Sequence, residues 1–220
     1  MRNNLPKHAQ IVIIGGGIMG CSTAYHLMKN GCRDVVLLER AKLTSGTTWH
    51  SAAQVRQLRS NESITKLVQN SVELYSILEE ETGQSTGWKQ SGSLSIATNP
   101  DRLTHIRRQV SLSKAFRIDA EEISLKEAAE KWPLMRTDDL IGAVYSPSDG
   151  RVGPSDICAA LIKGSKSKGL QVFEDTPVTG IRTENGRVAS VQTTQNEITC
   201  ETIVNCAGIW GRNIAAMIGV

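Results

Sequence analysis

The stretch IVIIGGGIMG, residues 11–20, begins with four β-branched apolar residues and continues directly into glycines. Such a run predicts a buried parallel strand, because a strand covered on both faces carries apolar side chains at every position. Residues 17–30 have apolar positions at helical spacing, and Gly31 is a typical helix end. Residues 34–40, DVVLLER, predict a second buried strand. The N-terminal part therefore predicts a βαβ unit.

The glycines after the first strand have the spacing GxGxxG, at Gly15, Gly17 and Gly20. In a dinucleotide site the first glycine allows a tight turn and the second lets the pyrophosphate approach the backbone. The third lets the helix pack closely on the sheet. The backbone N–H groups of Ile18 and Met19 would then face the phosphates at the positive end of the helix. The alternative is a glycine-rich turn that binds no ligand.

Glu39 ends the second strand, about 20 residues after the glycines, as the dinucleotide pattern requires. Its carboxylate can accept hydrogen bonds from the ribose hydroxyls of an adenosine. The same charge would repel a 2′-phosphate, which argues against NADP. NAD and FAD both remain compatible with this pattern.

The rest of the chain mixes helices and strands. We expect helices over 61–83, 101–115, 124–132 and 155–169, the third with a capping box at Ser124 and Glu127. We expect strands within 91–98, 141–150 and 170–175, and a β-meander over 177–208 with a hairpin turn at Asn185-Gly186.

A strand followed by glycine returns at 202–211, which suggests that one nucleotide-binding domain is interrupted by another. The expected fold is α/β, a Rossmann-like FAD-binding domain of the glutathione-reductase type. An α+β substrate domain with an antiparallel sheet interrupts it. We place the FAD-binding part at 8–60 and 150–220 and the substrate part at 84–149, within one incomplete domain over 1–220. The chain stops inside an expected helix, so we expect a C-terminal truncation.

Composition narrows the function classes. The 220 residues carry a net charge of +3 without a basic cluster, so we expect no nucleic-acid partner. No apolar run reaches the roughly 20 residues of a membrane span, and the N-terminus is too short and polar for a signal peptide. A cytoplasmic location is the resulting expectation. The five cysteines lack CxxC spacing, which predicts reduced thiols, and we expect no metal site.

Three features favour FAD over NAD. The glycine motif lies at the N-terminus, as in many flavoproteins. Residues 202–208, TIVNCAG, resemble a second FAD motif in which Ala207 and Gly208 lie near the cofactor. The segment from 151 to 181 resembles the region in which a valine, here Val178, meets the adenine.

Residues 43–53, LTSGTTWHSAA, together with the first βαβ unit, resemble the dimethylglycine dehydrogenase and sarcosine dehydrogenase family. This family lies within the D-amino-acid-oxidase-like flavoproteins, and the likeness covers the whole chain. It implies a covalent bond between the imidazole of His50 and the 8α carbon of FAD. Neutral imidazole is a good nucleophile near neutral pH. The alternative is that His50 is a packed loop histidine.

The resemblance also implies the reaction. The substrate would be an N-methylated amino acid such as sarcosine or dimethylglycine, whose N-methyl carbon gives a hydride to the flavin. The imine then releases formaldehyde or gives its carbon to tetrahydrofolate, which would bind a further C-terminal portion. The electron acceptor would be a flavoprotein, a quinone or oxygen.

Small and hydroxyl-bearing residues around His50 would let the chain approach FAD closely, and Arg40 and Trp210 are implied contacts. The expected contacts near His50 are Gly46, Thr47, Thr48, Trp49, Ser51, Ala52 and Ala53.

No side chain is a convincing general base, so the catalytic residues are not identified from the sequence. Arg56 or Arg59 is a candidate for binding a substrate carboxylate, and an exposed helix face is the alternative. Trp88 and Trp132 are expected to anchor the core. Asp149 and Asp156, beside a turn and a helix start, are expected to act as caps.

Two other functions remain open at this stage. An NAD-linked dehydrogenase could use the same glycine motif. A non-catalytic homologue, such as a phosphatase regulatory subunit, could retain this fold.

Overall fold

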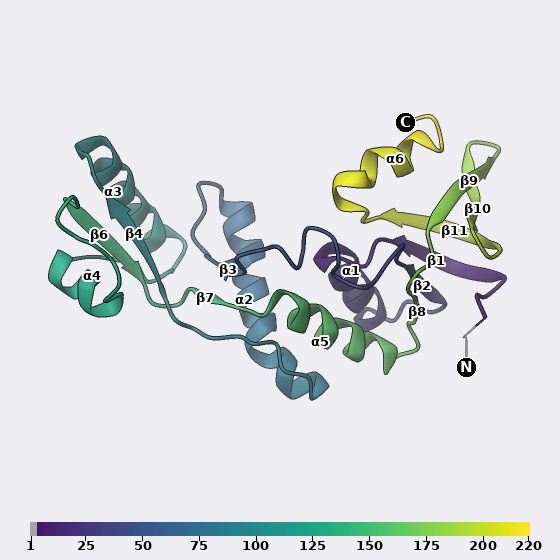
Figure 1. The fold of residues 1–220 in the computed structure, drawn as a ribbon, viewed down its shortest axis with the longest axis horizontal. Coiled ribbons are helices and arrows are strands. Elements are labelled where there is room, and N and C mark those ends of the chain that lie inside the picture. Colours follow the sequence, from purple (N-terminus) through teal and green to yellow (C-terminus); the bar gives the residue numbers. More distant parts are fainter. Residues whose placement is uncertain (1–3) are drawn as a thin grey trace. The chain divides into compact units, whose positions relative to one another are not determined.

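The computed structural model describes residues 4–220, which divide into two compact units (Figure 1). The first unit takes in the chain up to Ala52, together with Leu78–Thr86 and Gly153–Val220. The second comprises Ala53–Ile77 and Gly87–Val152, so helix α2 (Glu62–Thr82) contributes to both. No helix within residues 4–220 has the length and apolar character needed to cross a membrane.

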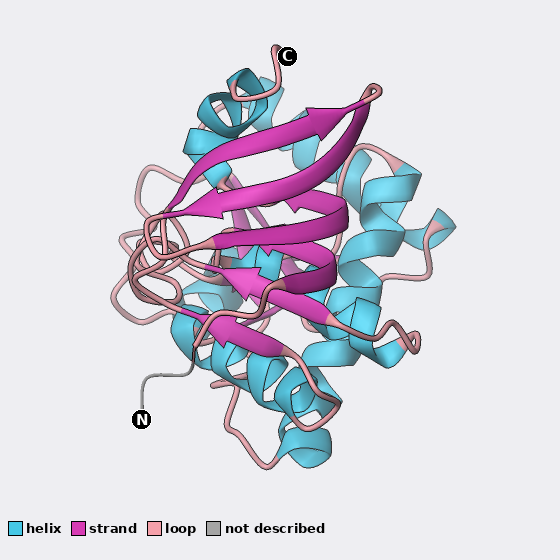
Figure 2. Cartoon of the chain, turned by 90° about the vertical axis from the view of Figure 1, so that its right-hand side faces the viewer, coloured by secondary structure: helices cyan, strands magenta, loops and turns pink. Residues whose placement is uncertain are grey.

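The first unit contains a six-stranded sheet in the order β8-β2-β1-β11-β10-β9 (Figure 2). The strands are β1 (His8–Ile14), β2 (Val35–Leu38), β8 (Gln171–Phe173), β9 (Val178–Glu184), β10 (Arg187–Thr193) and β11 (Glu197–Asn205). Strand β1 runs parallel to both β2 and β11, whereas β9, β10 and β11 form an antiparallel meander. Both predicted features of this sheet, the parallel strand pair and the meander, are confirmed.

The hairpin between β9 and β10 turns at Asn185 and Gly186. Both residues have positive φ, 51° and 74° respectively. A two-residue turn of this kind matches the twist of the flanking strands and favours asparagine followed by glycine. The predicted hairpin is therefore confirmed.

The central strands of this sheet are buried on both faces. Val12 and Ile14 point to one face and join a cluster with Val36 and Leu38, while Ile13 points to the other and is also fully buried. Helices α1 (Ile18–Lys29) and α5 (Pro154–Lys166) pack against each other. The short helices η1 (Gly208–Trp210) and α6 (Gly211–Ala216) follow β11. Burial on both faces explains why these strands read as continuous apolar runs.

The second unit has its own sheet, with the antiparallel order β4-β6-β5. Its strands are β4 (Ser93–Ala97), β5 (Glu121–Ile123) and β6 (Gly142–Ser146), and its other elements are α3 (Pro100–Ala115), α4 (Leu125–Lys131) and the strand pair β3 (Gln54–Val55) and β7 (Gly150–Arg151). Ile106 of α3 packs on Ala97 and Val144 in a small core. The capping box of Ser124 and Glu127 at the start of α4 is present as predicted.

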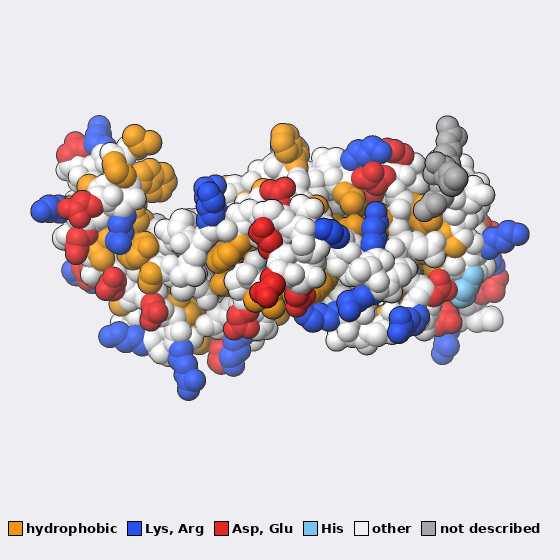
Figure 3. Space-filling view, turned by 90° about the horizontal axis from the view of Figure 1, so that it is seen from below, with side chains coloured by type: hydrophobic (Ala, Val, Ile, Leu, Met, Phe, Trp, Pro, Cys, Tyr) orange, Lys and Arg blue, Asp and Glu red, His pale blue; other side chains and the backbone are white. Residues whose placement is uncertain are grey.

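On the face shown in Figure 3, acidic and basic side chains are interspersed.

One expectation and one alternative about side-chain environments are wrong. Trp132 does not anchor the core, because its side chain is 57% exposed. It follows the end of α4, and Ala128 is the buried residue of that helix. Arg56 and Arg59 do not lie on a helix face. The side chain of Asn61 accepts a hydrogen bond from the N–H of Ile64 and starts α2, so both arginines precede that helix.

Asp149 does more than cap a turn. Its side chain is buried, accepts a hydrogen bond from the N–H of Gln57 (2.8 Å) and accepts another from the hydroxyl of Ser93 (2.6 Å). It therefore joins the segment after β3 to the start of β4 in the second unit. The expectation that Asp156 caps α5 is wrong. Gly153 occupies the N-cap position without a side-chain cap, and Asp156 lies in the first turn, where an acidic side chain suits the helix dipole.

We expect Asp149→Ala to lower the free energy of unfolding by about 2 kcal/mol, because it leaves the N–H of Gln57 without its acceptor. Urea unfolding followed by circular dichroism measures this loss. The matched control is Asp138→Ala, which removes an exposed carboxylate paired with Arg136 and should change stability by less than about 0.5 kcal/mol. Equal effects of the two substitutions would contradict the role of Asp149.

Candidate cofactor-binding cleft

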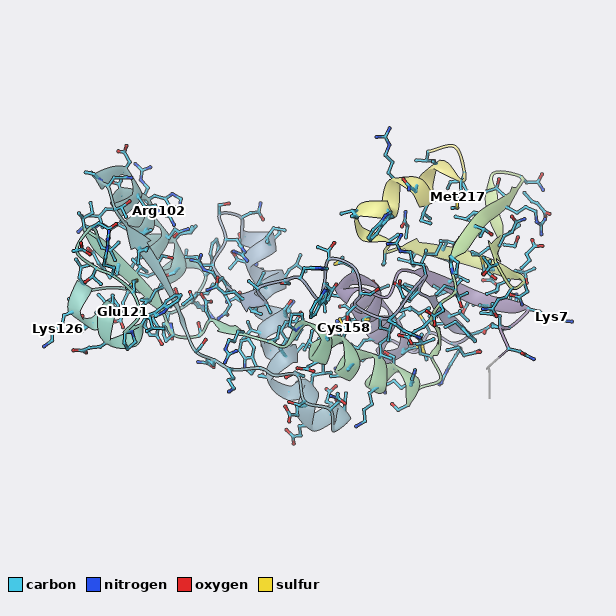
Figure 4. All side chains as sticks on the ribbon, viewed as in Figure 1. Lys7, Arg102, Glu121, Lys126, Cys158 and Met217 are labelled. Atoms are coloured by element: carbon cyan, nitrogen blue, oxygen red, sulfur yellow. The ribbon has the colours of Figure 1, made fainter. Side chains whose placement is uncertain are left out.

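A cleft of about 730 Å³ opens in the first unit, at the carboxyl ends of β1, β2 and β11. Its walls come from the glycine turn after β1, the loop after β2, the start of β9 and the helices after β11. Met217, labelled in Figure 4, contributes from just beyond α6. The carboxyl edge of a parallel sheet is the usual position of a ligand site in open α/β folds.

The glycine turn brings three segments into close contact. Gly15 has φ of 112°, and a Cβ atom at this position would lie 2.4 Å from the carbonyl oxygen of Cys206, after β11. A Cβ atom at Gly20 would lie only 1.8 Å from the carbonyl oxygen of Gly15. Glycine at both positions therefore allows the start of α1 to sit directly behind the turn.

The carboxylate of Glu39 is fixed beside this turn by the backbone. One oxygen, Oε2, accepts a hydrogen bond from the N–H of Gly16 (2.7 Å), and Oε1 accepts one from the N–H of Ala41 (2.9 Å). Each carboxylate oxygen has a second lone pair and can accept a further hydrogen bond. Glu39 thus combines a structural role, which the sequence pattern did not indicate, with the capacity to bind a hydroxyl group at the wall of the cleft.

Thr48 supplies a side chain where α1 begins with a glycine. Gly17 occupies the N-cap position and has no side chain, and Thr48 Oγ1 accepts the hydrogen bond from the N–H of Ile18 (2.9 Å). The N–H of Ile18 was expected to face a phosphate, but here it is donated to Thr48. The loop after β2 is thereby tied to the N-terminus of α1.

His50 lies in a series of tight turns next to the cleft. Its N–H donates to the carbonyl of Thr47, and the N–H of Trp49 donates to the carbonyl of Thr44, both over 3.2 Å. The imidazole Nδ1 lies 2.9 Å from the carbonyl oxygen of Gly46, and Nε2 accepts a hydrogen bond from the indole of Trp49 over 3.2 Å. The ring of His50 is therefore held by its own loop.

Arg40 and Trp210 meet at the cleft wall from opposite ends of the sequence. The guanidinium carbon of Arg40, which follows Glu39, lies 3.7 Å from the centroid of the Trp210 ring. This is a cation–π contact, which joins the loop after β2 to the short helix η1 after β11.

Most of the residues expected to bind the cofactor line this one cleft. They are Gly15, Gly17, Ile18, Met19, Glu39, Arg40, Gly46, Thr47, Thr48, Ser51, Val178, Ala207, Gly208 and Trp210. Gly20, Trp49, His50, Ala52 and Ala53 are not among the lining residues. Gly20 packs behind the turn, and the rings of Trp49 and His50 contact each other.

Other lining residues were not identified from the sequence. They are Ile14, Leu38, Thr176, Pro177, Cys206, Ile209, Asn213, Ile214 and Met217. Ser45, one of the small residues expected to let the chain approach FAD closely, also lines the cleft. The positions of Ile14 and Leu38 at the ends of predicted parallel strands could have indicated this role, since ligands bind at such strand ends. The sequence did not indicate that residues 213–217 line a cleft, because helical spacing does not reveal which surface a helix covers.

The fold and the cleft define a Rossmann-like dinucleotide-binding domain. The family model for FAD-dependent oxidoreductases, DAO, matches residues 10–220, and the chain belongs to this family. Membership supports FAD as the cofactor. The expected fold class and the resemblance to sarcosine and dimethylglycine dehydrogenases are both confirmed.

Similar proteins point the same way. The chain is 44% identical to mitochondrial sarcosine dehydrogenase of Mus musculus, over 98% of this chain and 24% of that protein. It is 37% identical to mitochondrial dimethylglycine dehydrogenase of Rattus norvegicus, over 96% of this chain and 25% of that protein. It is also 41% identical to the mitochondrial pyruvate dehydrogenase phosphatase regulatory subunit of Mus musculus, over 94% of this chain and 24% of that protein. The chain thus spans about a quarter of the length of these relatives.

The crystal structure of L-proline dehydrogenase from P. horikoshii superimposes with a TM-score of 0.92 at 31% identity. The match covers 98% of this chain and 57% of that chain. It supports the fold described above.

We expect Gly20→Ala to lower the free energy of unfolding by about 3 kcal/mol, because the new methyl group would clash with the carbonyl of Gly15. Helix propensity alone would give the opposite sign, a gain of about 1 kcal/mol. The matched control is Gly46→Ala, whose methyl group would meet the Trp210 ring at an ordinary 3.5 Å. Thermal unfolding measured by circular dichroism distinguishes these outcomes, and a stabilised Gly20→Ala variant would contradict the packing argument.

Proposed function

We propose that this chain is the FAD-binding part of an enzyme that oxidatively demethylates an N-methylated amino acid such as sarcosine or dimethylglycine. The observation that carries the proposal is the position of the TTWH turn, residues 47–50. Thr47 and Thr48 line the cleft of a DAO-family domain, and His50 lies immediately beyond them. The 44% identity to a sarcosine dehydrogenase and the 37% identity to a dimethylglycine dehydrogenase support the substrate class.

The residues of the cleft fit FAD. The absence of side chains at Gly15 and Gly17 leaves the backbone open to a pyrophosphate, and Glu39 can accept a hydrogen bond from a ribose hydroxyl. The hydroxyl groups of Thr47 and Thr48 can bind phosphate or ribityl oxygens. Val178 would contact the adenine. When bound, FAD supplies the acceptor for the electron pair that leaves the amine, while the protein binds and orients it.

We further propose that His50 forms a covalent bond to FAD through its imidazole. The ring is beside the cleft and exposed, on a loop whose neighbouring residues Thr48 and Ser51 line it. The remaining proposed contacts are those of Trp49, Ala52 and Ala53, while Gly20 would contribute to the FAD site by letting α1 pack behind the glycine turn. The electron acceptor would be a flavoprotein, a quinone or oxygen, and tetrahydrofolate would bind a further portion of a longer protein.

A second candidate function is regulatory. The 41% identity to a phosphatase regulatory subunit shows that a protein with this fold can carry a different name and role. A bound flavin that is not reduced by any N-methylated amino acid would favour this reading, and a protein that binds NAD but not FAD would favour an NAD-linked dehydrogenase. A cytoplasmic location stays a prediction, since these relatives are named as mitochondrial proteins.

The covalent bond is tested by acid precipitation. We expect flavin absorbance to remain in the pellet of the wild-type protein and to vanish from that of His50→Ala, because only a covalent link survives denaturation. The matched control, His105→Ala, removes an exposed histidine of α3 and should leave the pellet coloured. Flavin that washes out of the wild-type pellet would contradict the covalent bond.

Binding of the substrate carboxylate is tested by replacing two arginines of the second unit. Arg56 donates from Nη2 to the hydroxyl of Ser95 over 2.7 Å, and its Nε is buried without a partner, whereas Arg59 is exposed. We expect Arg56→Gln or Arg59→Gln to raise KM for sarcosine about 10- to 100-fold, because a charge-assisted hydrogen bond contributes about 1.5–3 kcal/mol. Steady-state kinetics measure this, with Arg108→Gln of α3 as the control. Unchanged KM in both variants would contradict a role for either arginine.

A further inference from the structure

The side chains of Arg40 and Trp210 meet across the end of strand β1. The strand order β2-β1-β11 places β1 between the two strands after which these residues follow. Ile14, the last residue of β1, lies beside Leu38 of β2 and Asn205 of β11, so the three strands end level with one another. Since neighbouring strands lie about 4.8 Å apart, a gap of roughly 10 Å separates the two outer strands. The contact of 3.7 Å between the Arg40 guanidinium and the centroid of the Trp210 ring closes this gap.

This contact lies over the part of the cleft where a pyrophosphate would bind. Gly15 and Gly17 form the turn after β1, and they line the same cleft as Arg40 and Trp210. FAD has a narrow pyrophosphate in its middle and a broad ring system at each end. The broad ends cannot pass beneath a contact that spans the narrow middle, so this contact has to open before FAD can enter or leave.

We propose that η1, residues 208–210, is a strap that opens to admit FAD and closes over it, with the contact between Trp210 and Arg40 as its latch. The inference rests on the binding of FAD in this cleft, as proposed above, but it does not require a covalent bond to His50. The latch sets how fast FAD enters and leaves the cleft, because binding that needs a conformational change is slowed by the scarcity of the open form.

The exposure of η1 makes local opening inexpensive. Ile209 is 74% exposed, Gly208 is exposed and Trp210 is half-buried. A segment with so few buried apolar contacts opens at a small cost in free energy. Gly208, which has φ of 57°, and Gly211 flank the two large side chains, and small residues at the ends of a moving segment absorb changes in backbone angles readily.

The chain on both sides of the strap is fixed, which confines the movement to η1. The side chain of Asn205 donates to the carbonyl of Gly211 (2.8 Å) and accepts from the N–H of Ala207 (3.2 Å). Ile214 of α6 belongs to the core cluster of the first unit. The base of the strap therefore stays in place when Trp210 leaves Arg40.

Two contacts hold the strap closed, and both involve the loop after β2. Besides Arg40, the Trp210 ring lies against Gly46, where a Cβ atom would be 3.5 Å from Cζ3 of the ring. Arg40 is exposed, and an exposed cation–π contact changes an equilibrium about two- to fivefold. The latch is thus strong enough to change the open fraction measurably and weak enough to open without help.

The experiment measures the rates of FAD binding and release in the His50→Ala chain, in which binding is reversible. Stopped-flow flavin fluorescence follows the association, and dilution of the complex follows the release. We expect Trp210→Leu to raise both rate constants by the same factor, about two- to fivefold, and to leave Kd unchanged. The reason is that the strap closes the cleft both before and after binding, so a weaker latch raises the open fraction of both forms equally.

A second variant tests the other half of the latch. Arg40→Lys keeps the positive charge but loses the planar guanidinium, so it should also raise both rate constants. It should have no further effect in the Trp210→Leu background, where the latch is already lost. The matched control is Trp132→Leu, which removes an exposed tryptophan of the second unit and should change neither rate constant.

Association that is unchanged or slower in Trp210→Leu would overturn the strap even if release is faster, since a tryptophan that only contacts bound FAD affects its release alone. Additive effects of the two substitutions would overturn the latch. The proposed function is separated by a further result. If the rates change as expected but no N-methylated amino acid reduces the bound flavin, the strap is supported and the proposed substrate class is overturned. A chain that binds no FAD would overturn both.

Discussion

The first unit depends on one steric constraint, the close approach of the start of α1 to the turn that follows β1. The position of a Cβ atom at Gly20 would fall 1.8 Å from the carbonyl of Gly15, and one at Gly15 would fall 2.4 Å from the carbonyl of Cys206. Three chain segments, from β1, α1 and the end of β11, therefore share a space that side chains would fill. The space left in front of the turn is the cleft, so the same contact that packs the helix also creates the site.

Polar contacts then hold the loop after β2 against this turn. Glu39 binds the N–H of Gly16, and Thr48 binds the N–H of Ile18, so two side chains of this region satisfy donors that a glycine-rich turn cannot satisfy by itself. Arg40 makes a cation–π contact with Trp210, which joins the short helix η1, after β11, to the same loop. The loop that carries His50 is in this way joined by side-chain contacts to the glycine turn and to η1.

Much of this unit could be predicted because its constraints are local in the sequence. The run Ile11–Ile14 and the glycines after it indicate the strand, the turn and the helix within a few residues of each other. The two residues Asn185 and Gly186 are enough to indicate the hairpin. The contributions of Cys206 and Met217 to the cleft could not be predicted, since they depend on how distant elements pack. The same limit explains Trp132: an aromatic residue after a helix looks like a core residue until the partners of that helix are known.

The pairing of β1 with β11 has a consequence for how the chain is made. Ile11 lies beside Thr202, so β1 gains its second neighbour only when 191 further residues have been added to the chain. At the usual rate of about 5–20 residues per second, synthesis leaves one edge of a very apolar strand without its partner for roughly 10–40 s. An unpaired edge of this kind readily joins other chains. Temporary cover of this edge, by a chaperone or by the chain's own helices, would prevent such pairing during this interval.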